Sequence, residues 1–269
     1  MYQKIDEILS IVLEAGKAIM HIYQSDSIQI NEKKDSSPLT DADLASNQII
    51  THGLSKISEY PILSEEGKDI PFEIRKTWEQ FWLVDPIDGT KEFINRNGEF
   101  TVNVAFLERI NSEYIPTLGI VFAPALNKIY WNDEKHAYCA KTDDQFKILQ
   151  ESIEIIQATT AVDPFKIVGS RSHSGPETET YITELKNIYK NVEFISMGSS
   201  LKLCLVAEGV ANIYPRLGPT MEWDIAAAHA VCLKANCNVY SVINSDISNA
   251  NSTMKYNKEN LLNSHFIVK

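Results

Sequence analysis

The chain has 269 residues, of which 44% are hydrophobic and 23% are charged, and its formal net charge is −11 at neutral pH. A chain of this length and composition can bury a large core without a disulfide or a structural metal. The excess of acidic residues argues against binding of polymeric nucleic acid, because that affinity comes mainly from Lys and Arg that neutralise phosphates. A small phosphorylated ligand is not excluded, since bound cations can reverse the local charge of a site.

The sequence contains no targeting or membrane-spanning pattern. No basic segment followed by an apolar run stands at the N-terminus, and no stretch approaches the roughly 18 apolar residues of a membrane span. The four cysteines form neither a C-x-x-C pair nor a zinc-binding spacing. We therefore expect a soluble, cytoplasmic protein with reduced cysteines.

Helices and then strands are expected in the first half of the chain. Apolar residues recur at helical spacing from Ile5 to Tyr23, and a second helix is expected from the capping residues near Thr40 to Ile57. The pattern then predicts strands at residues 61–63, 81–84, 100–107, 117–122, 128–131 and 136–140. Two helices followed by a run of strands indicate a layered α+β arrangement.

The second half alternates between strands and helices. Strands are predicted at residues 166–168, 192–195, 211–214 and 266–268, and helices at 177–189, 201–208 and 223–233. A polar stretch at residues 141–157 separates the two halves. We therefore predict an N-terminal α+β metal-binding domain over residues 1–150 and a C-terminal α/β substrate-binding domain over residues 151–269.

The strongest local motif follows the predicted strand at residues 81–84 and reads Asp85-Pro86-Ile87-Asp88-Gly89-Thr90. In a tight turn both aspartates and the carbonyl of Ile87 would face one point, and such hard oxygen ligands suit Mg²⁺. Gly89 permits unusual backbone angles. The backbone N–H groups of Gly89, Thr90 and Lys91 would then lie at the start of a helix or turn and could bind a phosphate. The alternative is an ordinary Asp-Pro turn in which an aspartate caps the end of a strand.

Two further carboxylates occupy comparable positions. Glu65 follows the short predicted strand at residues 61–63, and Asp224 stands at the start of the helix expected at 223–233. Each is ordinary by itself, as a solvated acidic turn or a helix-capping aspartate. Carboxylates at three separate strand ends or helix starts together indicate a metal site.

These motifs resemble the signature of the inositol monophosphatase superfamily, through residues 85–90, Glu65 upstream and Trp223-Asp224-Ile225-Ala226-Ala227 downstream. Within it the chain most resembles the 3′(2′),5′-bisphosphate nucleotidases of the bacterial CysQ type, because Lys91-Glu92-Phe93 stands where inositol monophosphatases usually read Thr-Asn-Phe. Further matches extend nearly end to end and comprise Asn97-Gly98-Glu99-Phe100-Thr101-Val102-Asn103, Ser170-Arg171-Ser172-His173, Gly198-Ser199-Ser200-Leu201-Lys202 and Tyr214-Pro215-Arg216.

The resemblance implies an α/β fold, the layered α/β/α/β/α sandwich shared with fructose bisphosphatases, and two or three Mg²⁺ ions. One ion would be held by Glu65, Asp85 and the carbonyl of Ile87, and a second by Asp85, Asp88 and Asp224. Glu65 would also reach a third, weaker ion. The implied catalytic residues are Glu65 and the pair Asp43 and Thr90, which orients the attacking water. Asp41 and Ala228 depart from the pattern of the family, and His229 is expected to be a packed helix residue.

The resemblance also implies a substrate, adenosine 3′,5′-bisphosphate, which would be hydrolysed to AMP and phosphate. This reaction recycles the by-product of sulfate activation and belongs to sulfur metabolism. Ser199, Lys202 and Arg216 would hold the second phosphate, and His173 would contact the base or ribose. The remaining substrate contacts are expected from Glu65, Asp88, Gly89, Thr90, Lys91 and Asp224. Inhibition by Li⁺ is expected from the same resemblance.

Two alternatives stay open. The same chemistry could act on an inositol phosphate or fructose 1,6-bisphosphate, against which Lys91-Glu92 and the pair Lys202 and Arg216 argue. A protein that only binds cations is the alternative from a different class, against which the water-orienting pair argues. The expected partner is a small phosphorylated nucleotide, and peripheral association with the inner membrane is left open.

Overall fold

A seven-stranded sheet is the centre of the fold in the computed structural model, which describes residues 1–25, 30–32, 38–170, 175–242 and 252–269. Its strands, in spatial order, are β3 (Ile62–Ser64), β4 (Gln80–Asp88), β5 (Thr101–Ile110), β6 (Glu113–Ala123), β7 (Lys128–Asn132), β8 (Ala137–Lys141) and β9 (Glu154–Ile156). Strands β3 and β4 run parallel, and the other neighbouring pairs are antiparallel. The ends of β3 and β4 therefore meet at one edge of the sheet, which is where the site forms.

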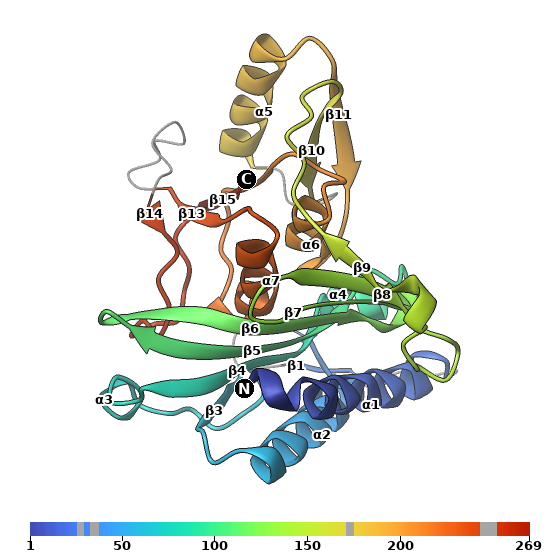
Figure 1. The fold of residues 1–269 in the computed structure, drawn as a ribbon, viewed down its shortest axis with the longest axis vertical. Coiled ribbons are helices and arrows are strands. Elements are labelled where there is room, and N and C mark those ends of the chain that lie inside the picture. The colour runs from blue at the N-terminus through green and yellow to red at the C-terminus, as the bar shows by residue number, and fades with distance from the viewer. Residues whose placement is uncertain (26–29, 33–37, 171–174, 243–251) are drawn as a thin grey trace.

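Helices α1 (Ile5–Tyr23) and α2 (Asp41–Ile57) cover one face of this sheet (Figure 1). Both helices confirm the predictions made from the apolar spacing and capping residues of the sequence. Ile8, Val12 and Ile19 of α1 are fully buried against the sheet, where the rings of Trp82 and Phe106 lie 4.8 Å apart. Burial of this apolar stripe, rather than helix propensity, supplies most of the stability of such helices.

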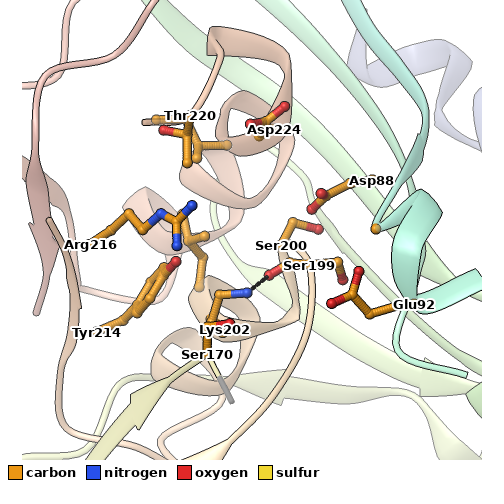
Figure 2. A pocket seen from close by; sticks show the side chains of 13 residues that line it. Asp88, Glu92, Ser170, Ser199, Ser200, Lys202, Tyr214, Arg216, Thr220 and Asp224 are labelled. Carbon is orange, nitrogen blue, oxygen red and sulfur yellow. Dashed lines mark hydrogen bonds between the residues drawn. The ribbon is translucent and has the colours of Figure 1, made fainter. Parts of the chain in front are cut away.

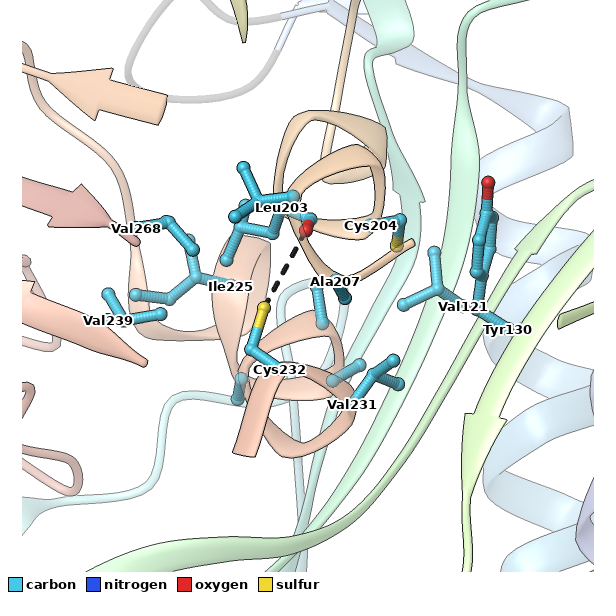
Figure 3. Packing of buried hydrophobic residues seen from close by; sticks show 14 of the residues in the cluster. Val121, Tyr130, Leu203, Cys204, Ala207, Ile225, Val231, Cys232, Val239 and Val268 are labelled. Carbon is cyan, nitrogen blue, oxygen red and sulfur yellow. Dashed lines mark hydrogen bonds between the residues drawn. The ribbon is translucent and has the colours of Figure 1, made fainter. Parts of the chain in front are cut away.

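Helices α6 (Leu201–Ala207) and α7 (Glu222–Lys234) lie on the opposite face, between the first sheet and the second (Figure 3). All seven residues of α6 are buried, as expected for a helix covered on every side. The backbone of α7 approaches β6 so closely that a Cβ atom at Gly119 would lie 2.0 Å from the carbonyl oxygen of Ala227. Only glycine fits there, and α7 is thereby held against the sheet.

The second sheet has the order β12 (Tyr214–Arg216), β15 (Phe266–Val268), β13 (Val239–Ser241) and β14 (Ser252–Thr253). A parallel pair, β10 (Phe165–Gly169) and β11 (Val192–Ser196), adjoins it through a bridge between Ile167 and Ile213. Helix α5 (Pro176–Ile188) packs on the outer side with Ile182 and Leu185. The layers alternate α/β/α/β/α, which confirms the predicted fold class.

Shorter elements complete the chain: β1 (Ile30–Glu32), β2 (Pro38–Thr40), α3 (Phe72–Arg75), α4 (Thr90–Ile94) and the 3₁₀ turns η1 (Tyr2–Lys4), η2 (Pro124–Leu126) and η3 (Gln150–Ser152). The strand predicted at residues 211–214 exists, but its predicted bounds are wrong, because β12 begins only at Tyr214. The side chain of Asn212 accepts the backbone N–H of Lys166 at 2.7 Å and so replaces a regular ladder bond before β12. Strand β9 extends the first sheet to Ile156, and the division into two domains stays a prediction.

Candidate active site

The Asp85-to-Thr90 motif lies at the end of β4 and continues the strand. The tight turn predicted from the sequence is wrong. Asp85 pairs with Asn103 and Asp88 pairs with Thr101 of β5, and the register is irregular between them. The irregularity alters the alternation of side chains that a regular strand would impose. Gly89 then turns the chain with φ of +90° and ψ of 43°, angles that strain other residues, and α4 starts at Thr90.

Glu65 lies beside the first aspartate because β3 is parallel to β4. The backbone N–H of Glu65 donates to the carbonyl of Val84 at 3.1 Å. Asp85 is 1% exposed, and its Oδ1 has no hydrogen-bond partner among the described residues. Burial, reinforced by the negative charges of Glu65, Asp88 and Asp224, raises the pKa of Asp85 well above its usual range.

Asp224 reaches the same region from α7. Its Oδ2 accepts the backbone N–H of Met221 at 2.8 Å, which fixes the side chain in the first turn of the helix. Burial and the charge of Asp88 raise the pKa of Asp224 well above its usual range. Burial raises the pKa of Asp88 to about 6, and the charge of Lys202 opposes that shift. The carboxylates are therefore near enough to destabilise one another's charged forms.

The four carboxylates do not surround a single point. Within the described part of the chain, no three His, Cys, Asp or Glu side chains lie together closely enough to hold one metal ion. The carboxylates nevertheless repel one another, because the negative charges of the other members of the set contribute to the raised pKa values of Asp85 and Asp224.

Asp43 and Thr90, the predicted water-orienting pair, are brought together by the packing of α2 on β4. Thr90 Oγ1 donates to Asp43 Oδ1 at 3.3 Å. The other oxygen of Asp43 accepts the backbone N–H of Thr40 at 2.8 Å and the Thr40 hydroxyl at 2.5 Å. Asp43 is 1% exposed. The carboxylate is thus held from both sides in one orientation.

A pocket opens beside Asp88 and Asp224 (Figure 2). Its lining comprises Asp88, Gly89, Glu92, Ser170, Ser199, Ser200, Lys202, Leu203, Tyr214, Arg216, Thr220, Asp224 and Ile225. Figure 2 shows the side chains of Asp88 and Glu92 on one side and those of Tyr214 and Arg216 on the other. The pocket therefore combines anionic and cationic groups, as a site for a metal-bound phosphate would require.

Lys202 lies within this pocket on the first turn of α6. It is 7% exposed, and its Nζ donates to the carbonyl of Ser199 at 2.6 Å and lies 5.5 Å from the ring centre of Tyr214. Burial lowers the pKa of Lys202 to about 8, and the charge of Asp88 limits that fall. An ammonium group that is buried and only partly hydrogen-bonded favours an anionic ligand.

Two further polar atoms in the pocket are buried and have no hydrogen-bond partner within the described ranges. They are Ser199 Oγ and Arg216 Nε. Arg216 donates one bond, from Nη2 to the carbonyl of Pro219 at 3.0 Å. Buried polar groups are seldom left unpaired in proteins, so these atoms indicate a polar ligand.

The serines before α6 do not cap the helix with their side chains. Ser199 has φ of +47°, and the Ser200 hydroxyl makes no capping bond. Ser200 Oγ instead lies 2.8 Å from Thr101 Oγ1 and donates to Asn103 Oδ1 at 2.7 Å. These bonds tie the start of α6 to β5, opposite Asp85 and Asp88.

Not every predicted substrate contact lies at the pocket. Lys91 is exposed and does not line it, and His173 lies outside the described residues. Glu92, Tyr214 and Thr220 line the pocket although they were not predicted as site residues. Tyr214 could have been predicted from Arg216, because residues two apart on a strand point to the same face.

Comparison with known proteins places this fold and site in a family. The sequence model of the inositol monophosphatase family matches residues 1–264, and the chain belongs to this family. The 3′(2′),5′-bisphosphate nucleotidase CysQ of Salmonella typhimurium is 40% identical over 238 residues, which are 88% of this chain and 89% of the relative. The protein of the same name from Escherichia coli K12 is 41% identical over 239 residues, with the same shares.

A solved structure agrees with the sequence relatives. CysQ from Bacteroides thetaiotaomicron, described as a bacterial member of the inositol monophosphatase family, is 42% identical and has a TM-score of 0.85. The match covers 100% of this chain and 97% of that one. The predicted resemblance to bisphosphate nucleotidases of the CysQ type is therefore confirmed.

Proposed function

We propose that this protein hydrolyses adenosine 3′,5′-bisphosphate to AMP and phosphate with the help of Mg²⁺. The proposal is supported by relatives named 3′(2′),5′-bisphosphate nucleotidase at 40% and 41% identity over most of the chain. The reaction would recycle the by-product of sulfate activation. The structural observation that carries the proposal is a pair of cations, Lys202 and Arg216, in the pocket beside the carboxylates.

The carboxylates fit a divalent cation. Asp85 Oδ1 is a buried acceptor that lacks a partner within the described residues, and burial disfavours the charge of Asp85 and Asp224. Nearby positive charge would offset both costs. We propose that Mg²⁺ draws these groups closer together than they lie without it. Glu65, Asp85 and the Ile87 carbonyl would hold one ion and Asp85, Asp88 and Asp224 a second, with a weaker third position at Glu65. Bound Mg²⁺ would activate water and stabilise the leaving oxygen.

Asp43 and Thr90 are proposed to orient the attacking water. Because Thr90 donates its hydroxyl hydrogen to Asp43, the Thr90 oxygen is left as an acceptor. A water beside it would donate one hydrogen to Thr90 and so turn a lone pair toward the phosphorus. The Thr40 bonds to the second oxygen of Asp43 keep the carboxylate correctly turned.

The phosphate that does not react is proposed to bind Lys202, Arg216 and Ser199. Each of the three contributes a buried polar atom to the pocket, and those of Arg216 and Ser199 lack a partner among the described residues. The binding energy of this second phosphate would serve to position the first. The other contacts remain as predicted from the sequence: Glu65, Asp88, Gly89, Thr90, Lys91, His173 and Asp224.

A substrate comparison tests the proposal. We expect phosphate release from adenosine 3′,5′-bisphosphate with a higher kcat/KM than from inositol 1-phosphate. Arg216→Ala should lower kcat/KM for the bisphosphate. The corresponding loss of transition-state stabilisation should be about 2 kcal/mol or more, the size expected for a lost charge-assisted bond. It should barely change the slow hydrolysis of inositol 1-phosphate, which has no second phosphate.

Arg109→Ala is the matched control, because Arg109 pairs with Glu79 on the surface, away from the pocket. A wild-type preference for inositol 1-phosphate would instead support an inositol monophosphatase. Loss of both activities to an equal degree in Arg216→Ala would also contradict the nucleotidase assignment. A protein that binds Mg²⁺ and releases no phosphate from either substrate would be a cation-binding protein alone.

We propose a cytoplasmic location from the state of the cysteines. Cys139, Cys204, Cys232 and Cys237 are all free and buried, which fits the reducing cytoplasm. Among the described residues, no helix has both the length and the apolar character needed to cross a membrane. Peripheral membrane association is not part of the proposal.

A further inference from the structure

Helix α2 buries polar side chains on the face that meets the site. Asp43 is 1% exposed and Ser46 is fully buried, and Asn47 is half-buried on the same face. Residues three and four apart share one side of a helix. An amphipathic helix normally covers a sheet with apolar residues, so buried polar groups there require partners.

Ser46 bonds to the segment that carries Asp85. Its Oγ donates to the carbonyl oxygen of Pro86 at 2.9 Å. Pro86 lies between Asp85 and Ile87, whose carboxylate and carbonyl are the proposed ligands. A bond to the intervening carbonyl restrains the peptide planes on both sides of Pro86, and thus the directions of both ligand groups.

Asn47, the next residue, bonds to both neighbours of Glu65. Its Oδ1 accepts the hydroxyl of Ser64 at 2.7 Å, and its Nδ2 donates to the carbonyl of Glu66 at 3.4 Å. A backbone bond of 3.0 Å from the Gly67 N–H to the Ser64 carbonyl closes the turn that contains Glu65. One amide side chain therefore spans the turn from which Glu65 projects.

We infer that Ser46 and Asn47 are positioning residues that set Glu65 at the correct spacing from Asp85 and the Ile87 carbonyl. Two adjacent residues of one rigid helix hold the two ligand-bearing segments, which end neighbouring parallel strands. The inference rests on the proposed function, in which these groups bind Mg²⁺. The affinity for Mg²⁺ would then depend on side chains that touch neither metal nor substrate. Such outer-shell partners of metal ligands often tune the affinity of a site.

The test measures Mg²⁺ binding without substrate. Metal-free protein is titrated with MgCl₂ by calorimetry, and the rise of its Tm with Mg²⁺ is followed in parallel. Ser46→Ala and Asn47→Ala should each weaken Mg²⁺ binding by about 10-fold or more, the usual effect of losing an outer-shell partner. KM for the bisphosphate at saturating Mg²⁺ should stay near the wild-type value, because the pocket cations are untouched.

Two exposed positions on the same helix provide matched controls. Gln48 is the adjacent amide residue, and the Ser55 hydroxyl donates to the His52 carbonyl of its own helix at 2.9 Å. Gln48→Ala and Ser55→Ala should leave Mg²⁺ affinity unchanged. If Asn47→Ala does not fold, Ser64→Ala removes the same bond from the other side, and Ser64→Thr should restore affinity because it keeps the hydroxyl.

A further variant separates the inference from the proposed function. Glu65→Gln removes a proposed ligand charge and should weaken Mg²⁺ binding more than either positioning variant. If Glu65→Gln binds Mg²⁺ poorly while Ser46→Ala and Asn47→Ala bind it as tightly as the controls, the positioning role is wrong and the metal site stands. If Glu65→Gln binds Mg²⁺ as the wild type does, the metal site is wrong, and the inference fails with it.

Discussion

Thr90 donates its hydroxyl to Asp43 Oδ1 at 3.3 Å, although the two residues are 47 positions apart in the chain. Thr40, which immediately precedes α2, donates its backbone N–H and its hydroxyl to the other oxygen of the same carboxylate. Asp43→Asn replaces one acceptor with a donor and should break the orientation of Thr90. We expect kcat to fall by about 10²–10⁴-fold, as for the loss of a positioned proton acceptor.

Mg²⁺ affinity and KM should change little in Asp43→Asn, because Asp43 is not a proposed ligand or substrate anchor. Steady-state kinetics and a Mg²⁺ titration measure the two quantities separately. Thr51→Val is the control, since among the described residues the Thr51 hydroxyl donates only to carbonyls within α2. A kcat within a factor of two of the wild type would contradict the role of the pair.

The buried Asp85 and Asp224 should each make a contribution to the stability of the metal-free protein that falls as the pH rises. Burial raises the folded-state pKa values of Asp85 and Asp224 above the ordinary value of 3.8. The folded state therefore keeps protons that the unfolded state has released. The resulting contribution to stability is fully present below pH 3.8 and is lost as the pH rises through the folded-state pKa values. Thermal melts in chelator across a pH series measure this loss.

Asp85→Asn should reverse part of that loss while it abolishes activity. The amide carries no charge, so the metal-free variant should melt higher than the wild type at neutral pH, by about 2–4 °C for each kcal/mol of relieved repulsion. Mg²⁺ should raise the Tm of the wild type but not of the variant. A variant that melts lower than the wild type in chelator would refute the repulsion argument.

Lys202 should control the alkaline limb of the activity profile. Its pKa is lowered to about 8, chiefly by burial, so the charge is present below pH 8 and is lost above it. Since kcat/KM reports the free enzyme, its value for the bisphosphate should fall about tenfold per unit above pH 8. The value for inositol 1-phosphate should not show this limb.

Lys202→Met keeps the length of the side chain and its packing against Tyr214 while removing the charge. The variant should have a low kcat/KM for the bisphosphate at pH 7 and no limb near pH 8. An unchanged limb in Lys202→Met would assign the titration to another group. Stability of the variant should equal or exceed that of the wild type, because a buried charge is removed.

Li⁺ should inhibit the enzyme by competing with Mg²⁺ for the weaker cation position at Glu65. We expect half-inhibition at about 1 mM Li⁺ or below, a magnitude taken from the family resemblance and from a weakly held hard cation. Phosphate release is measured against K⁺ at equal ionic strength. Full activity at tens of millimolar Li⁺, roughly, would contradict a shared arrangement of three cation positions.

Local patterns in the sequence were enough to predict the elements that surround the site. The apolar periodicity of residues 5–23 and 41–57 predicted α1 and α2, and the acidic residues after the expected strands identified Glu65, Asp85 and Asp88. The local pattern fails at Pro86. It predicts a tight turn there, whereas β4 continues to Asp88, because pairing with Thr101 of β5 maintains the strand across an irregular register.

The sequence by itself determined the family, the layered fold class and the identity of the carboxylates and pocket cations. These properties reside in short motifs and in periodic patterns, each of which depends on residues close together in the chain. The pairing of Asp43 with Thr90 also followed from the family resemblance. Only the tertiary structure decided the other contacts around the site, those of Asn47 with the turn around Glu65 and of Ser200 with Thr101 and Asn103. These contacts join residues far apart in the chain, and no local pattern encodes them. They exist because helices α2 and α6 pack against the strands that carry the ligands, and that packing is a property of the whole core.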